Sequence, residues 1–502
     1  MKSFLRPIIP IIGALVAPFL HAKEKSNQPN IIFILADDLG MQDVGFMGSD
    51  YFETPHLDAL AKGSVVFNNA FMYPTCSPSR ASLLTGKQSF RTRCYTVPVL
   101  ERGKAADNIF SKWTVGTEHP VYSEPLNKAG YQLIHLGKWH IVGPNPKTEN
   151  ATLAKGRKIS QPKGGNLTWL PEHKTEEIQK FYPTGRGFHQ NVGGLWWGDP
   201  ARGYDKGYKS ISGGYIAPFK NPFIEEQQDS DQWLTDRLTT DAITFIKENN
   251  DKPFFVNLHY YAPHRPSVAR DEESLKHFQN KPADPKTGQN PKKKKELAAY
   301  ATMVKSLDDN IKRLTDFLDQ SGLRDNTIII FTSDNGFNGL QSMTKNLRGA
   351  KGNVYDGGLR VPCLVNWKGT YSASKIDTPI FGLDFFPTFL KLAQVTDFTS
   401  TLDGTDISPL FEGKTIEERP LYWHIASHYK DPPCSIIREG DWKLIQYLLS
   451  GKIELYDTKI DQKESHNLAE EQPEKAAAMV AKLTAWREQH NVPLPKNSTL
   501  EK

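Results

Sequence analysis

The 502-residue sequence is poor in cysteine and has no strong excess of charge of either sign. Its four cysteines form no Cys-x-x-Cys pair, so neither a disulfide framework nor a structural zinc site is indicated; they are Cys76, Cys94, Cys363 and Cys434. With 62 basic against 57 acidic residues the net charge is only +5, which indicates no nucleic-acid partner. A hydrophobic fraction of 38% excludes a disordered chain, and only one apolar run approaches membrane-spanning length.

That single apolar run has the pattern of an export signal. Lys2 and Arg6 precede an apolar stretch over 8–20 that prolines and a glycine interrupt, and the stretch ends at the small residue Ala22 before a charged segment. We therefore expect residues 1–22 to be a signal peptide and the mature protein to be periplasmic or secreted, without stable membrane insertion. An uncleaved membrane anchor is the alternative, which the shortness of the run disfavours.

Strands and helices alternate along the first four fifths of the chain. Continuous apolar, β-branched runs are typical of strands buried on both faces of a parallel sheet, and they occur at 30–36, 131–136, 253–259 and 327–332. Helical patterns separate them at 55–63, 123–129, 231–249, 296–320 and 385–393. The alternation predicts an α/β fold with a large, mostly parallel sheet sandwiched by helices. Ligands of such sheets bind at the carboxyl ends of the strands.

The pattern changes after about residue 396. Short strands separated by turns are predicted at 421–423, 435–438, 443–447 and 454–457, followed by a helix over 473–489. We expect a catalytic α/β domain over 23–395 and a subdomain over 396–502 with a small antiparallel sheet and one helix.

Two stretches, 141–230 and 271–295, have the composition of surface insertions, and the second ends in a run of four lysines, 292–295. That run is read either as a solvated helix start or as a device that steers a polyanion.

Polar side chains follow two of the predicted strands. Asp37 and Asp38 come directly after the first strand, and Asp334 and Asn335 follow the strand over 327–332. Two adjacent carboxylates both stay ionised only beside a cation or strong hydrogen-bond donors. Three carboxylates and an amide are hard oxygen ligands, which favour Ca²⁺, with Mg²⁺ possible. Turn chemistry at the strand ends is the alternative reading for each pair alone.

The most specific segment is 76–86, which reads Cys-Ser-Pro-Ser-Arg-Ala-Ser-Leu-Leu-Thr-Gly. It resembles the motif of the formylglycine-dependent (type I, Cys-x-Pro-Ser-Arg) sulfatases of the alkaline phosphatase-like superfamily, in particular bacterial exported polysaccharide sulfatases. The other blocks of the family occur in order; they are Asp37-Asp38, Gly137-Lys138-Trp139-His140, Pro263-His264-Arg265-Pro266, Asp334-Asn335-Gly336 and Gly349-Ala350-Lys351-Gly352. The resemblance is plain over about 29–365. One departure is Asp356, where the family has Glu; we expect a shortened carboxylate behind the site, with no effect on the catalytic roles.

The resemblance implies that Cys76 is oxidised to Cα-formylglycine by a formylglycine-generating or sulfatase-maturating enzyme. One hydroxyl of the hydrated aldehyde would attack sulfur, activated by a divalent cation, and deprotonation of the other would expel sulfate and restore the aldehyde. The helix predicted over 79–84 would place its N-terminal N–H groups near the anion. By resemblance the metal ligands are Asp37, Asp38, Cys76, Asp334 and Asn335.

The resemblance also assigns the catalytic roles. Arg80 holds the formylglycine hydroxyl and neighbouring carboxylates, for which its planar fork is suited. Lys138 and Lys351 neutralise the sulfate oxygens. His140 is the expected base for the second hydroxyl, and His264, with Lys351, the acid that protonates the leaving alcohol.

The substrate is less defined by the sequence. Export, a pocket built for an anionic ester and basic loops together favour a sulfated carbohydrate, such as an algal galactan, ulvan or a glycosaminoglycan. A sugar-binding role is predicted for Trp196, Trp197, His428 and Arg438, with His189 as a further candidate. An aromatic pair such as Trp196-Trp197 also has a packing interpretation. The sulfated position, exo or endo action and the oligomeric state stay open.

Two rival functions remain. The first is a phosphonate or phosphate ester hydrolase of the same superfamily, some members of which also carry Cys-x-Pro-Ser-Arg. The paired lysines and the order of the blocks favour sulfate. The second is an exported polysaccharide-binding protein without catalysis, against which the complete set of predicted ligands argues.

Overall fold

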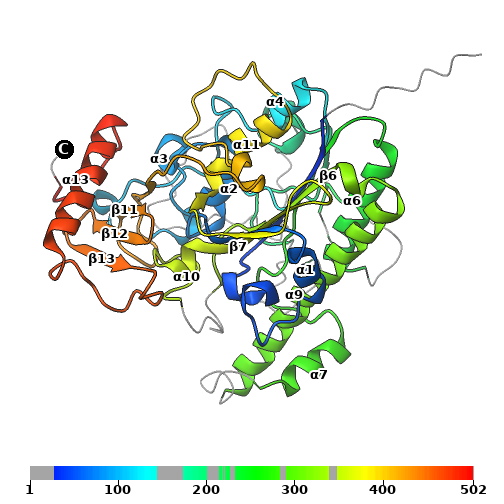
Figure 1. Cartoon of the computed structure of the whole chain (residues 1–502), viewed down its shortest axis with the longest axis horizontal. Helices are drawn as coiled ribbons and strands as arrows, with labels where there is room; N and C mark the ends of the chain where they lie inside the picture. The colour runs from blue at the N-terminus through cyan, green and yellow to red at the C-terminus, as the bar shows by residue number, and fades with distance from the viewer. Residues whose placement is uncertain are drawn as a thin grey trace, which may run out of the picture.

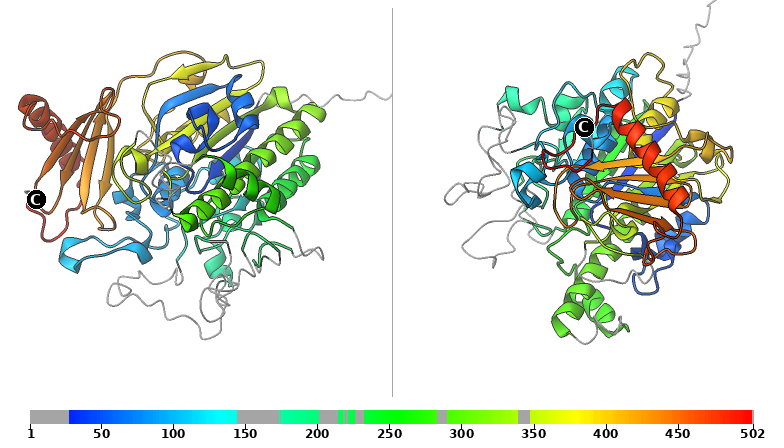
Figure 2. Two further views of the ribbon diagram at one scale, coloured as in Figure 1. Left: turned by 90° about the horizontal axis from the view of Figure 1, so that it is seen from below. Right: turned by 90° about the vertical axis from the view of Figure 1, so that its left-hand side faces the viewer.

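The computed structural model places two β-sheets side by side, each with its own helices (Figures 1 and 2). It describes residues 28–143, 173, 175–200, 214–217, 219, 221–225, 232–282, 290–338 and 347–500. The predicted signal peptide, 1–22, and a large part of the predicted insertion 141–230 therefore lie outside the described residues. Within the described ranges, no helix is both long enough and apolar enough to cross a bilayer.

The larger sheet is mixed and mostly parallel. In the described residues its strands are β1 (Asn30–Ala36), β2 (Val65–Phe71), β3 (Gln132–Gly137), β4 (Gln190–Val192), β5 (Phe254–His259), β6 (Thr327–Ser333), β7 (Arg360–Trp367), β8 (Ser374–Ile376) and β9 (Ile380–Phe381). Their order is β4-β3-β5-β1-β6-β7-β2-β8, with β9 also paired to β2. The strands from β4 to β6 in this order run parallel, whereas β7 is antiparallel to both of its neighbours.

Helices cover both faces of this sheet, because its central strands are apolar on both sides. In β1, Phe33 belongs to one core cluster and Ile34 to the other. One face carries α1 (Pro55–Ala61), α6 (Leu234–Glu248) and α9 (Pro291–Gln320), and the opposite face carries α2 (Cys76–Thr85), α4 (Ser123–Lys128) and α11 (Phe385–Leu392). Each fully buried aromatic or branched side chain contributes roughly 1.5–3 kcal/mol to this sandwich. Shorter or peripheral helices are α3 (Ser89–Thr92), α5 (Glu176–Gln179), α7 (Glu272–Asn280), α10 (Asp356–Leu359) and α12 (Ser408–Phe411).

The smaller sheet is antiparallel and contains β10 (Leu421–Ile425), β11 (Cys434–Glu439), β12 (Trp442–Tyr447) and β13 (Ile453–Asp457). Alternating side chains point to its two faces. Ile436 shares a core cluster with Phe71 of the large sheet, and Leu444 shares one with Leu483 of α13 (Pro473–Gln489). The small sheet is thus packed between the large unit and one covering helix (Figure 2).

The fold class predicted from the sequence is confirmed. The four predicted strands of the large sheet become β1, β3, β5 and β6, and the final helix lies where it was expected. The lysine run 292–295 forms the first turn of α9, which begins earlier than predicted because Asn290 caps it by accepting from the N–H groups of Lys292 and Lys293. Residues beyond 395 still belong to the large core, where Ile407 and Phe411 are buried, so the small sheet starts only at Leu421.

Candidate active site

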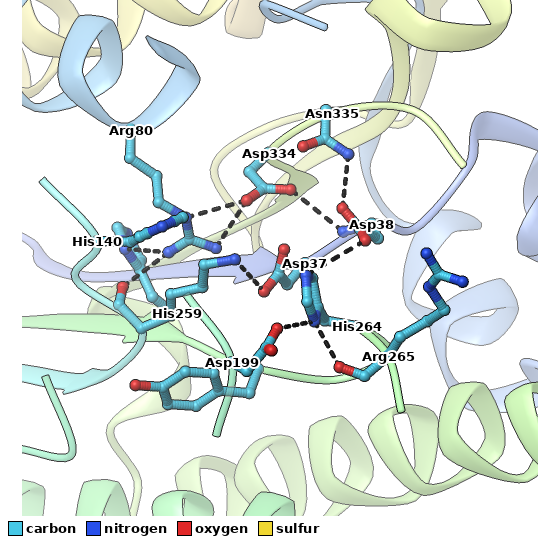
Figure 3. A network of polar contacts seen from close by, with 12 residues as sticks. Asp37, Asp38, Arg80, His140, Asp199, His259, His264, Arg265, Asp334 and Asn335 are labelled. Carbon is cyan, nitrogen blue, oxygen red and sulfur yellow. Dashed lines mark hydrogen bonds and ion pairs between the residues drawn. The ribbon is translucent and has the colours of Figure 1, made fainter. Parts of the chain in front are cut away.

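The predicted metal ligands meet at the carboxyl ends of two paired strands. Ala36 at the end of β1 lies opposite Ser333 at the end of β6, so Asp37 and Asp38 emerge beside Asp334. The backbone N–H of Asp334 donates to the carbonyl of Ala36 at 3.0 Å, and the N–H of Asp38 donates to Asp334 Oδ1 at 3.2 Å. The carboxyl ends of parallel strands are where α/β sheets bind ligands. Figure 3 shows Asn335 and these three carboxylates together.

Three cations compensate these carboxylates, of which Lys138 and Arg80 are buried and Lys351 is partly buried. Lys138 Nζ lies 2.6 Å from Asp37 Oδ2, and Lys351 Nζ lies 2.6 Å from Asp38 Oδ1. Arg80 Nε donates to Asp334 Oδ2 at 2.9 Å. Removing one member of such a buried pair leaves an uncompensated charge, so the side chains hold one another in place.

The three ion pairs do not fully compensate the negative charge of the buried carboxylates. Burial raises the pKa of Asp334 to about 6, and the neighbouring Asp37 adds to that effect. Burial also raises the pKa of Asp37, in spite of its ion pair with Lys138. Burial acts in the same direction on Asp38, but Lys351 and His264 outweigh it and hold the pKa of Asp38 below its ordinary range. The site therefore favours additional positive charge.

Two oxygen atoms of this cluster are available for a cation. Asp37 Oδ1 and Asn335 Oδ1 are buried and accept no hydrogen bond from any described residue. Asn335 directs its amide Nδ2 to Asp38 Oδ1 at 2.8 Å. Carboxylate and amide oxygens that lack donors are suited to a hard divalent ion. The residues present thus fit the predicted Ca²⁺ or Mg²⁺.

Cys76 is the first residue of α2 and lies beside the same carboxylates. Its Sγ and the nearest ligand atoms of Asp37, Asp38 and His264 all lie within 4.8 Å of one another. Burial raises the pKa of the Cys76 thiol to about 12, although Lys138 and Lys351 oppose the shift. The unmodified thiol therefore stays neutral here, and a neutral thiol is a poor nucleophile and a poor metal ligand.

Arg80 lies one helical turn after Cys76 and connects several strand ends. Besides its bond to Asp334, its Nη1 donates to the carbonyl of Lys138 at 2.7 Å and lies 3.3 Å from His259 Nδ1. His259 ends β5 and is kept neutral, because burial and Arg80 lower its pKa well below the ordinary value. Sequence reasoning missed His259, although it closes the predicted strand 253–259.

The two predicted catalytic histidines both reach the site, from opposite sides. His140 has a left-handed backbone, with φ of 60°, and its Nδ1 lies 3.5 Å from Ser77 Oγ. Gly198 packs against the imidazole, since a Cβ there would lie 2.4 Å from His140 Cε1. Burial, followed by the charge of Lys138, lowers the pKa of His140 well below its ordinary value. His140 is therefore a neutral imidazole that can accept a proton.

His264 lies on the side of Asp38 and of Asp199, a residue that the sequence did not single out. His264 Nδ1 lies 2.7 Å from the carbonyl oxygen of Arg265 and 3.1 Å from Asp199 Oδ1, and its Nε2 lies 3.7 Å from Asp38 Oδ2 (Figure 3). Burial lowers the pKa of His264 to about 4, against the opposing effect of Asp38. Asp199 follows the Trp196-Trp197 pair, which was the only local signal for it.

The predicted sugar-binding residues differ in exposure and in their distance along the strands from the site. Trp196 is 1% exposed, and its ring packs against Trp113 and Trp197 with centroids 6.2 and 5.2 Å away, which makes it a core residue. Trp197 is partly exposed and remains a candidate. His428 is partly exposed in the loop after β10, where its backbone N–H donates to Asn108 Oδ1. His189 lies at the start of β4, where Nδ1 accepts from the N–H of Leu133, far back along β3 from its carboxyl end.

Arg438 and Asp356 do not occupy the places expected of them. Arg438 is 2% exposed, and its Nη2 donates to Thr458 Oγ1, so the guanidinium is enclosed and offers nothing to a sugar. Asp356 binds the ammonium of Lys443 in β12 at 2.8 Å. The expectation of a carboxylate behind the catalytic groups is therefore corrected, because Asp356 joins the two sheets.

The match to known families agrees with this geometry. The Sulfatase family pattern matches residues 29–395, which is more than half of the chain.

The chain belongs to the sulfatase family.

It is a sulfuric ester hydrolase, as the resemblance of the segment 76–86 implied. A second pattern, described as N-sulphoglucosamine sulphohydrolase, C-terminal, matches residues 350–490.

Relatives of this sulfatase cover almost its whole length. A sulfatase of Formosa agariphila is 28% identical over 98% of this chain and 95% of its own. An N-acetylgalactosamine-6-O-sulfatase of Bacteroides thetaiotaomicron is 27% identical over 94% of this chain and 96% of its own. The crystal structure of Ps i-CgsB is similar with a TM-score of 0.69 and 27% identity over 94% of this chain and 95% of that chain. The same protein is also described in complex with k-i-k-neocarrahexaose.

Proposed function

We propose that this sulfatase removes sulfate groups from oligosaccharides of a sulfated galactan, outside the cytoplasm, with residue 76 as Cα-formylglycine and Ca²⁺ bound by Asp37, Asp38, Asp334 and Asn335. The observation that carries the proposal is the position of Cys76 at the start of α2, buried beside Asp37, Asp38 and His264 and near the two lysines that pair with these carboxylates. A thiol with its pKa raised to about 12 cannot act as a thiolate there. Oxidation of Cys76 to an aldehyde supplies hydroxyl groups in its place.

The surrounding residues have separate tasks in this proposal. A divalent cation supplies the positive charge that lowers the pKa of a hydroxyl group bound to it. Lys138 and Lys351 place two ammonium groups where the sulfate oxygens bind, in a site from which most water is excluded. Arg80, fixed by Asp334 and the carbonyl of Lys138, orients residue 76 one turn before it. These groups bind the anion and stabilise negative charge that develops during transfer.

The histidines handle protons. His140, neutral and 6% exposed, is the proposed base for the hydroxyl group that does not attack sulfur. His264, with Lys351, is the proposed acid for the leaving alcohol. Burial lowers the pKa of His264 to about 4 in the absence of substrate, and Asp38 and Asp199 oppose that shift, so we propose that the bound sulfate anion further favours the protonated form. The two histidines approach from different segments, which allows one to act on the enzyme and the other on the substrate.

The substrate class rests on the relatives and the export pattern. Ps i-CgsB, similar over nearly the whole chain, binds a neocarrahexaose, which supports a sulfated galactan. The N-acetylgalactosamine-6-O-sulfatase supports the second candidate, a glycosaminoglycan. Periplasmic or secreted placement follows from the N-terminal pattern and suits a polymer that cannot enter the cytoplasm. Sulfate release from galactan, ulvan and glycosaminoglycan oligosaccharides, compared as kcat/KM, distinguishes these candidates.

Two measurements test the chemistry. Mass spectrometry of the tryptic peptide 63–80 from active protein should find an aldehyde or its hydrate at residue 76, whereas active protein with an intact thiol would contradict the proposal. Cys76→Ser should lower turnover by about 10³-fold or more while retaining ligand binding, because serine cannot form the diol. Cys94→Ser, at another buried free cysteine, is the matched control and should keep turnover.

A comparison of matched aryl esters tests the reaction class. We expect aryl sulfate to be turned over faster than the corresponding aryl phosphate, since Lys138 and Lys351 are already paired with carboxylates, and the carboxylates repel the second negative charge of a phosphate ester. A much higher rate with the phosphate ester would favour the phosphate or phosphonate hydrolase instead.

A further inference from the structure

A loop of the small sheet lies against the segment that carries Lys351. This β10–β11 loop comprises residues 426–433, between Ile425 and Cys434. Asp431 Oδ2 accepts from the backbone N–H of Val354 at 2.8 Å and from Asn353 Nδ2 at 3.1 Å. Asp431 therefore fixes the loop to residues two and three positions beyond Lys351.

Gly352 allows that loop to approach closely. It has φ of +88°, and a Cβ there would lie 2.4 Å from Tyr429 Cε1 and 3.2 Å from Lys430 Cδ. The N–H of Gly352 donates to the carbonyl of Pro74 at 2.6 Å, two residues before Cys76. The side chain of Lys430 thus lies against Gly352, the residue that follows Lys351, and Gly352 is in turn bonded to the segment that leads to Cys76.

Lys430 and Arg265 bring positive charge to the surface beside Lys351 and His264. Both side chains are exposed, and neither forms an ion pair with any residue that the structure describes. Burial followed by the charge of Lys351 lowers the pKa of Lys430, and Arg265 adds to that effect. The carboxylates of Asp431 and Asp38 act in the opposite direction without outweighing it. Gathering unpaired like charges at one place is unfavourable unless an anion neutralises them. Lys138 and Lys351 already serve the sulfate group that is removed, so Lys430 and Arg265 are left for a second anion.

We propose that Lys430, with Arg265, binds a second oxyanionic substituent of the substrate, on the sugar next to the one that loses sulfate. The substituent is a sulfate ester or a carboxylate, and Asp431 is the positioning residue that holds the loop of Lys430 against the Lys351 segment. This inference rests on the proposed function, because it assigns a preference for multiply charged oligosaccharides to the same site. The small sheet thereby contributes directly to substrate selection.

The test measures binding as inhibition of aryl sulfate turnover, so that it does not depend on cleavage of the oligosaccharide. Galactan tetrasaccharides with one or with two sulfate esters are compared, together with a monosulfated one that bears a uronate. Wild type should bind the doubly charged compounds more tightly than the monosulfated one. Lys430→Met should reduce this preference by about tenfold or more, since hydrogen bonds to charged groups are strong. Lys430→Arg should retain most of it, and Lys276→Met, an exposed lysine on α7, should leave it unchanged.

Asp431→Ala distinguishes positioning from mere folding. It should reduce the same preference, and the double variant Lys430→Met/Asp431→Ala should lose no more than Lys430→Met alone, because both changes remove one interaction. Equal inhibition of wild type by singly and doubly charged compounds, or an unchanged preference in Lys430→Met, would overturn the inference. Sulfate release from none of the galactans would instead overturn the proposed substrate class, while the inhibition data would still decide the role of Lys430.

Discussion

Two clusters of buried charge occupy different parts of this sulfatase and differ in how completely they are paired. We call them the site cluster, formed by Asp37, Asp38, Arg80, Lys138, Asp334 and Lys351, and the interface cluster, formed by Asp356, Arg438, Lys443 and Glu464. In the interface cluster every carboxylate oxygen has a partner: Lys443 and Arg438 bind Asp356, and Lys443 and the N–H of Asp356 bind Glu464. In the site cluster, Asp37 Oδ1 has none among the described residues.

The difference separates a structural role from a functional one. A buried cluster whose carboxylate oxygens are all paired needs no added cation, and this one acts as a joint between α10 and the small sheet. A cluster with unpaired oxygens is incomplete until a cation or substrate arrives, and such incompleteness is retained at functional sites at some cost to stability. Substitution of a charged residue in the interface cluster should therefore lower mainly the stability of the fold. Substitution of a residue in the site cluster should lower mainly the affinity for ligands.

Removal of the cation that joins the interface cluster should have the largest effect on stability. Lys443 is 1% exposed and binds both Asp356 and Glu464, at 2.8 and 2.7 Å. Lys443→Met leaves two buried carboxylates without their common partner and should lower the free energy of unfolding by about 3–5 kcal/mol. Chemical denaturation followed by fluorescence measures this loss.

The small sheet supplies a matched control for that change. Lys452 is 62% exposed and lies 2.9 Å from Glu454, so Lys452→Met should cost less than about 1 kcal/mol. The double variant Lys443→Met/Glu464→Gln should recover part of the loss, because it removes one of the stranded charges. Equal losses for the two lysine variants would refute the assignment of the interface cluster as a joint.

The second-largest expected effect is the stabilisation of the protein by Ca²⁺, which should depend on the site cluster and not on the interface cluster. Ca²⁺ at about 100 times its Kd should stabilise the wild type by about 2.7 kcal/mol, measured as a rise in Tm relative to protein in EDTA. Asn335→Ala removes a neutral ligand and one unpaired oxygen, and it should abolish most of that rise. Because it also removes the hydrogen bond to Asp38, the rise is measured for each protein against the same protein in EDTA. Glu464→Gln should keep the full rise. A calcium response unchanged by Asn335→Ala would exclude Asn335 from the ligands.

The parallel part of the fold was predictable because its strands are continuous apolar runs, but the antiparallel part of the large sheet was not. β2 carries Asn68 and Asn69 within the strand, which interrupts the apolar pattern. β7 contains Pro362, a residue that argues against a central strand. The structure accommodates Pro362 where the register between β2 and β7 shifts, so the missing N–H breaks no ladder bond. The sequence of either segment alone therefore does not indicate a strand, because the pairing of β2 with β7 is what accommodates these residues.

Candidate site residues were predictable where they directly follow a strand, as Asp37 and Asp334 do, or belong to a motif, as Cys76 does. The contribution of the small sheet was not, since Asp431 and Lys430 reach the Lys351 segment from about eighty residues away and no local pattern marks them. The prediction for Arg438 failed for a related reason. An arginine in a strand looks the same in the sequence whether it faces a sugar or a buried carboxylate such as Asp356.

The last expected effect is a pH dependence confined to the interface cluster. Burial raises the pKa of Glu464 to about 7, and the nearby charge of Asp356 adds to the rise. Between about pH 4.5 and pH 7 the unfolded chain therefore loses this proton before the folded protein does, so the stability contributed by Glu464 falls as pH increases. Lys443 holds the pKa of Asp356 below its ordinary range, against the effect of burial, so Asp356 changes stability only at lower pH.

Glu464→Gln removes that dependence and should gain stability relative to wild type as pH rises through the same window, by at most about 1.4 kcal/mol per pH unit. Titration of the site cluster, including Asp334 with its pKa of about 6, is common to both proteins and cancels in the difference. Urea unfolding of the two proteins at several pH values measures it. Parallel stability profiles would mean that Glu464 is ionised throughout the window. The interface cluster would then stabilise the ionised form of Glu464 as it does that of Asp356.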